Sequence, residues 1–190
     1  YRLANRLHAT TDVETIEPQL LFKTGDPYVH GALEETARIL RGRRYFIDAR
    51  VTPLRLNPDN TVDVEVRVHD VWTLSPGFSY GRKGGENSTG IEIKDTNLMG
   101  WGKTLAFSRD SNVDRTSWLF NYSDPNLLGT WWTLGLDYAD SSDGYLHGLS
   151  IGRPFYSLGT PWSVGFIGSD GLSTVSRYDR GVIIDQFEAE

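Results

Sequence analysis

The sequence predicts a small α+β domain over residues 1–70, followed by antiparallel β-strands over residues 71–190. Three observations lead to this fold class. Apolar residues recur at helical spacing between Pro27 and Arg41. Valine alternates strictly with polar residues from Val62 to Val68, as in a half-buried strand. From Val71 onward the helical spacing disappears, and short alternating segments are separated by turn-forming clusters.

The bulk composition narrows the class of protein. The 190 residues are 38% hydrophobic and 23% charged, and this composition is too apolar for a disordered chain. The sequence has no run of about 18 apolar residues, so no membrane-spanning helix is predicted. A net charge of -6 without a Lys/Arg run argues against a nucleic-acid partner. The absence of cysteine excludes disulfides, a thiol nucleophile and Cys-ligated zinc. Because the chain opens at Tyr1 without an apolar leader, we expect a mature or excised fragment.

The predicted helix runs from Pro27 to about Arg41. Asp26 is suited to cap its N-terminus, and Pro27 fits the first helical position, where no N–H is needed. Gly42 is expected to end the helix. The face that should pack on a sheet consists of Val29, Leu33, Thr36, Ala37 and Leu40. A shorter helix is expected before it, around Ile16–Leu21.

Two strands are predicted after the helix, over Tyr45–Val51 and Val62–Val68, with turn chemistry at Leu56–Asn60 between them. A further strand within Arg2–His8 could complete this sheet. Helices on one face of a small sheet form an α+β layer. The residues expected to face inward are Tyr45, Ile47, Ala49 and Val51 on the first strand, and Val62, Val64, Val66 and Val68 on the second.

The second part consists of about eight alternating segments whose opposite face is small or polar. Their apolar positions include Phe78 and Tyr80, Ile91 and Ile93, Leu105 and Phe107, Trp118, Phe120 and Tyr122, Leu134, Leu136 and Tyr138, Leu149 and Ile151, Val164 and Phe166, and a weaker Val182–Phe187. Two interpretations remain open. One is a membrane barrel with a wet lumen, in which Leu134, Leu136 and Tyr138 face lipid and tryptophans gather near strand ends. The other is a soluble sandwich with a dry core.

The turns of the second part are of two alternating kinds. Polar turns lie at 84–87, 110–112 and 141–144. Turns richer in apolar residues lie at Asn97–Gly102, Asp124–Gly129 and Pro154–Gly159. Successive turns of an up-and-down barrel lie on opposite sides of the membrane, so this alternation favours the barrel.

Several stretches resemble a known family. Leu20–Tyr28, together with Arg38–Arg41 and the Val62–Val68 strand, resembles a polypeptide-transport-associated (POTRA) domain. The turn with Asn97, Gly100 and Gly102 resembles the Asn-x-x-Gly-x-Gly turn early in barrels of the BamA/TamA outer-membrane assembly and translocation family. Ser123–Asn126 followed by Leu134–Leu136 resembles the next turn and strand of that barrel.

Two departures from the family pattern matter. The family usually carries several POTRA domains, and at most one is visible here. Its Arg-Gly-Phe/Tyr loop motif is also missing, since Arg180-Gly181-Val182 does not match it. We therefore expect the N-terminal part of an outer-membrane β-barrel, truncated near its eighth strand.

The resemblance implies a protein of the bacterial outer membrane with its N-terminal domain in the periplasm. It implies assembly or translocation without enzyme activity or a cofactor. The implied partners are unfolded outer-membrane or secreted polypeptides, outer-membrane lipid and periplasmic accessory proteins. A client strand would add to the first barrel strand by β-augmentation. The residues expected at that edge are Leu74, Pro76, Phe78, Tyr80 and Arg82.

The alternatives are a two-partner-secretion transporter, the barrel anchor of a secreted passenger, and a soluble periplasmic β-rich binding module. Gly77–Gly81 and Gly148–Gly152 match Gly-x-Ser-x-Gly, but neither is followed by the helix that a hydrolase elbow needs. His69-Asp70 could be a general-base pair or a metal site, but His69 lies at an outward position of a strand, and the other histidines share no metal-ligand spacing with it. No catalytic or metal site is therefore predicted.

Overall fold

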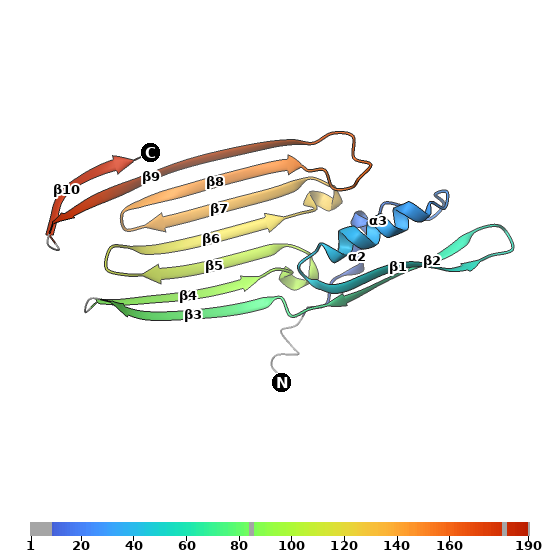
Figure 1. The fold of residues 1–190 in the computed structure, drawn as a ribbon, viewed down its shortest axis with the longest axis horizontal. Helices are drawn as coiled ribbons and strands as arrows, with labels where there is room; N and C mark the ends of the chain where they lie inside the picture. The colour runs from blue at the N-terminus through green and yellow to red at the C-terminus, as the bar shows by residue number, and fades with distance from the viewer. Residues whose placement is uncertain (1–8, 84–85, 180–181, 190) are drawn as a thin grey trace.

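The computed structural model describes residues 9–83, 86–179 and 182–189. Within this part of the chain, short helices and a two-stranded sheet precede an eight-stranded antiparallel sheet. Figure 1 shows the helices and the small sheet at one end of the long strands. The order of elements therefore agrees with the predicted fold class.

The main helix, α3, covers His30–Arg41 and ends at Gly42 as predicted. Its predicted start was wrong, because Val29 rather than Asp26 is the residue before the first turn. The Asp26 carboxylate instead accepts a hydrogen bond from the Lys23 amide at 2.8 Å and closes its own turn. Val29 is consequently 56% exposed and does not belong to the packed face. No helix in the described residues is long and apolar enough to span a membrane.

Two short helices precede α3. Helix α2 covers Val13–Ile16 and the 3-10 helix η1 covers Glu17–Gln19. The expected shorter helix is therefore present but begins earlier, and it ends before Leu20, whose backbone is extended.

Strands β1 (Phe46–Leu56) and β2 (Val62–Asp70) pair antiparallel and pack against α3. Their common core consists of Leu33, Ala37, Leu40, Tyr45, Phe46, Ala49 and Val51, with Val64, Val66 and Val68 packed on it. Ile47 was expected to face inward, but it is 76% exposed. A register shift between Phe46 and Asp48 turns Ile47 outward and brings Phe46 inward. The strand expected within Arg2–His8 lies outside the described residues.

The large sheet is a meander in which each strand pairs with the next. Its strands are β3 (Leu74–Lys83), β4 (Glu86–Asp95), β5 (Thr104–Ser111), β6 (Thr116–Asp124), β7 (Thr133–Ser141), β8 (Gly144–Arg153), β9 (Val164–Asp179) and β10 (Val182–Ala189). Direct cross-strand partners place Phe107, Phe120 and Tyr138 on one face, as the alternation predicted. The described strands of this part form one sheet and not two packed sheets, which favours the barrel over the sandwich.

The polar turns at 110–112 and 141–144 lie at the opposite end of the strands from the apolar turns (Figure 1). Residues 84 and 85 of the polar turn expected at 84–87 lie outside the described residues. The apolar turns, which include the 3-10 helices η2 (Leu98–Gly100) and η3 (Leu127–Gly129), lie at the end nearest to α3. We call the described residues from 9 to 70, which include α2, η1, α3, β1 and β2, the N-terminal unit. Three turns of the meander therefore lie on the side of the N-terminal unit. They are the turns at η2, at η3 and at the connection from β8 to β9.

Candidate functional site: a sheet edge and three docked turns

Strand β3 forms an edge of the large sheet, because within the described residues it pairs only with β4. The Thr96 amide donates to the Thr73 carbonyl at 3.3 Å, so these two residues form a hydrogen-bonded antiparallel pair. The register from there to the end of β3 has no shift. Leu74 and every second residue after it therefore direct their backbone N–H and C=O groups away from β4, toward the open side.

The residues on the open side are the five expected from the sequence, namely Leu74, Pro76, Phe78, Tyr80 and Arg82. Phe78 is 75% exposed and Tyr80 is 62% exposed. Proline lacks a backbone N–H and is tolerated in a sheet where that position faces outward, and Pro76 occupies such a position.

The turn with the pattern Asn-x-x-Gly-x-Gly brings Asn97, Gly100 and Gly102 together against the N-terminal unit. Asn97 is fully buried. Its Oδ1 accepts a hydrogen bond from the Gly102 amide at 2.7 Å, and its Nδ2 donates to the Thr11 hydroxyl at 2.8 Å. The side chain therefore closes its own turn and also holds a residue 86 positions earlier in the chain.

Glycine is required twice in this turn. Gly100 has φ of +85°, and a Cβ there would meet the Thr10 carbonyl oxygen. Gly102 has φ of +68°, and a Cβ there would lie 2.8 Å from Thr15 Cγ2. The Gly100 carbonyl accepts from the Asp12 amide at 3.0 Å and from the Thr15 hydroxyl at 2.9 Å. The turn and the segment before α2 can approach this closely only because Gly100 and Gly102 have no side chains.

The turn at η3 repeats the backbone of the turn at η2. Asn126 has φ −141° and ψ 58°, against −145° and 57° at Asn97. Leu128 has φ of +53° and Met99 has φ of +52°. Both turns follow the pattern Asp-x-Asn-Leu-x-Gly, at 95–100 and 124–129. The sequence contained this repeat, and it could have indicated that both turns have the same role.

The second turn also docks on the N-terminal unit. Arg43 Nη2 donates to Asn126 Oδ1 at 2.9 Å, and Arg43 Nε donates to Gln19 Oε1. Gln19 is fully buried and its Nε2 also donates to the Tyr45 hydroxyl at 3.1 Å. Burial lowers the pKa of Arg43 and raises that of Tyr45. This buried polar group was not predicted, because no local pattern distinguishes Gln19 or Arg43 from solvated residues.

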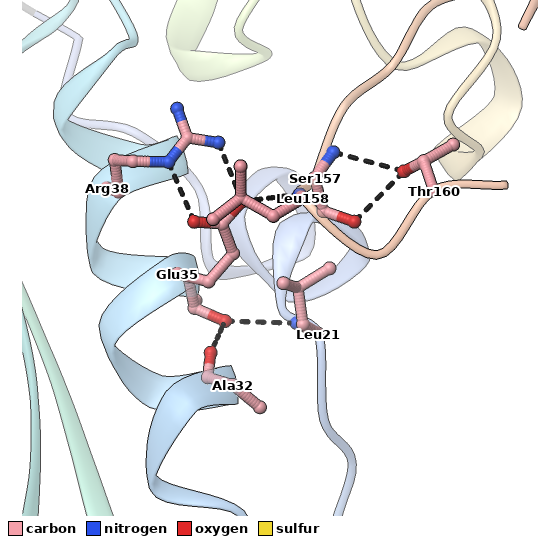
Figure 2. Close-up of polar contacts among 8 residues, drawn as sticks. Leu21, Ala32, Glu35, Arg38, Ser157, Leu158 and Thr160 are labelled. Carbon is pink, nitrogen blue, oxygen red and sulfur yellow. Dashed lines mark hydrogen bonds and ion pairs between the residues drawn. The ribbon is translucent and has the colours of Figure 1, made fainter.

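The third turn is fastened to α3 by Glu35 (Figure 2). The Leu158 amide donates to Glu35 Oε1 at 2.9 Å, and Arg38 donates twice to the same carboxylate, each at 2.7 Å. The hydrogen bonds from Arg38 and from the Leu158 amide lower the pKa of Glu35 from 4.5 to about 2. The charged carboxylate therefore links the helix to a residue 123 positions later.

The serines and histidine considered for catalysis do not form a site in the described residues. Ser79 lies within β3 and Ser150 within β8, so neither is at a strand-to-helix turn. His69 is exposed on β2, and the Asp70 carboxylate accepts hydrogen bonds from Thr11. The described residues contain no group of three or more His, Asp or Glu side chains that could hold a metal ion.

Comparison with known proteins supports the fold. No family model and no curated protein sequence matches the chain. Among solved structures, it is similar to the crystal structure of BamA from Haemophilus ducreyi lacking POTRA domains 1-3, with a TM-score of 0.62 and 15% sequence identity. The match covers 94% of this chain and 40% of that chain. The chain therefore shares the fold of part of that structure and spans less than half of its length.

Proposed function

We propose that this chain is part of an outer-membrane protein that assembles or translocates polypeptides, and that the β3 edge receives an extended client strand. The observation that carries the proposal is the set of outward backbone groups on β3. Main-chain hydrogen bonds to an added strand supply affinity with little demand on the client's sequence. The similarity of fold to part of BamA supports the same role.

The proposed location is the bacterial outer membrane, with a POTRA-like N-terminal unit in the periplasm. The apolar face with Phe107, Phe120 and Tyr138 would contact lipid, and the opposite face, with Asn121 and Asp137 hydrogen-bonded at 2.7 Å, would line a wet lumen. The three docked turns would then lie on the periplasmic side. The proposed partners are unfolded outer-membrane or secreted polypeptides, lipid and accessory periplasmic proteins, and no chemical step is required of the chain.

Photo-crosslinking tests the client edge. A photoreactive phenylalanine analogue is placed at Phe78 in one variant and at Phe120 in another, and the chain is reconstituted in lipid vesicles. Both positions belong to the same apolar face, but Phe120 is flanked by β5 and β7. A urea-unfolded outer-membrane barrel protein is then added as the client.

The proposal expects crosslinks to the client at position 78 and few at position 120. Equal crosslinking at both positions would indicate nonspecific contact through the apolar face. An absence of crosslinks at position 78 would contradict the proposed edge.

A further inference from the structure

The outward edge of β3 differs between its two halves. At Phe78, Tyr80 and Arg82 both the N–H and the C=O face the open side, where the described residues provide no neighbouring strand. Nearer to the N-terminal unit, two features reduce this hydrogen-bonding capacity. The indole Nε1 of Trp72 donates to the Leu74 carbonyl, which is one of the outward acceptors. Two residues further on, Pro76 has no N–H to donate.

We propose that Trp72 and Pro76 form a stop that confines strand addition to Phe78–Arg82 and thereby fixes where an added strand ends. This inference rests on the proposed function, since it concerns the same edge. The occupant is an extended client strand with apolar side chains at alternate positions. Such a strand continues the apolar face next to Phe78 and Tyr80, because directly opposite residues share a face of the sheet.

The stop works by leaving backbone groups of the added strand without partners. A strand that extended past Pro76 would place a carbonyl opposite a position without a donor. Its next donor would meet the Leu74 carbonyl, where it would compete with the Trp72 indole for the same acceptor. An unpaired backbone group away from water is costly, so pairing should end before these residues.

The position of Trp72 is itself fixed by its neighbours. Thr73 is buried, and its carbonyl accepts from the Thr96 amide, so the start of β3 is tied to β4. Two residues before Thr73, the Val71 amide donates to the Tyr45 carbonyl at 3.1 Å, which ties the same segment to the N-terminal unit. The indole donor is therefore supplied by a chain segment that is held on both sides.

Amide hydrogen exchange measured by NMR on the reconstituted chain tests this inference. The probe is a nine-residue peptide that copies Thr133–Ser141, an alternating strand long enough to pass Pro76. In the parent chain, the peptide should slow exchange at Phe78, Tyr80 and Arg82 and leave Leu74 unchanged. In a Trp72→Phe, Pro76→Ala double variant, slow exchange should extend to position 76 and to Leu74.

Ser75→Ala is the matched control, because the Ser75 backbone faces β4, and it should behave as the parent chain does. Slow exchange at Leu74 in the parent chain, or a boundary that the double variant leaves in place, would overturn the stop. If the peptide slows exchange at none of these amides, the proposed function fails as well, so the two failures are distinguishable.

Discussion

Single residues in three turns attach the N-terminal unit to the large sheet. Asn97 bonds Thr11, Asn126 bonds Arg43, and the Leu158 amide bonds Glu35. Hydrogen bonds of this kind contribute about 0.5–1.5 kcal/mol each, and more where one partner is charged. Their loss should therefore loosen the attachment without unfolding either part.

Gly100→Ala should have a larger effect than the loss of one hydrogen bond. A left-handed conformation costs a non-glycine residue about 1–2 kcal/mol, and the new Cβ would also meet the Thr10 carbonyl. We expect limited proteolysis to cut sooner between the N-terminal unit and the sheet. Gly159→Ala is the matched control, because a Cβ there has no neighbour within 4 Å. Equal cleavage rates in the two variants would show that the close approach at Gly100 is unimportant.

The Glu35 contact should depend on pH. Its pKa is lowered from 4.5 to about 2 in the folded chain, so its contribution is complete above about pH 4.5 and is lost as pH falls toward 2. The NMR shift of the Leu158 amide should report this titration with a midpoint near 2. Glu35→Gln should abolish the pH dependence, whereas Glu34→Gln, at a side chain that is 72% exposed, should not. A midpoint near 4.5 would contradict the charged link.

At the scale of elements, the two faces of a strand in the small sheet have different surroundings, one packed on the core and one exposed. Val64, Val66 and Val68 of β2 pack on the core beneath α3, while β1 exposes Leu54 at 63%. Alternation along each strand is thus converted into one packed side and one open side.

Val64→Asp should destabilise the N-terminal unit by several kcal/mol, because it places an unpaired charge against the core. Leu54→Asp makes the same chemical change on the exposed side and should be tolerated. Thermal unfolding followed by circular dichroism compares the two variants. A Val64→Asp variant that melts with the parent would contradict the assigned inward face.

Adjacent residues of β7 should report different surroundings in lipid. Leu136 lies on the apolar face opposite Tyr122, and Asp137 lies on the other face opposite Asn121. A spin label at Leu136 should be relaxed by a lipid-soluble quencher, and a label at Asp137 by a water-soluble one. Equal accessibility at both positions would rule out a barrel wall.

At the scale of the whole molecule, the described strands leave two edges of the large sheet without a partner, one at β3 and one at β10. Backbone groups that are unpaired in hydrocarbon cost several kcal/mol each. We therefore expect the chain in lipid to associate edge to edge or to aggregate when no other strand is supplied. Native mass spectrometry from lipid particles should detect dimers or larger species. A protease-resistant, heat-modifiable monomer would instead indicate closure, which eight strands can support geometrically.

The sequence by itself determined the strands, their two faces and the alternation of turns, because these depend on local spacing of apolar and polar residues. It also contained the Asn97, Gly100 and Gly102 pattern that singled out one of these turns. The outward direction of the Pro76 backbone followed only from the pairing register of β3 and β4. Only the tertiary structure decided that Ile47 faces outward, since a one-residue bulge exchanges the faces of a strand and leaves no periodic signal. The contacts of Thr11, Arg43 and Glu35 with turns 86, 83 and 123 residues away were likewise decided there. The meander brings those turns to one end of the sheet, and hydrogen bonds between such distant residues depend on that arrangement and not on local spacing.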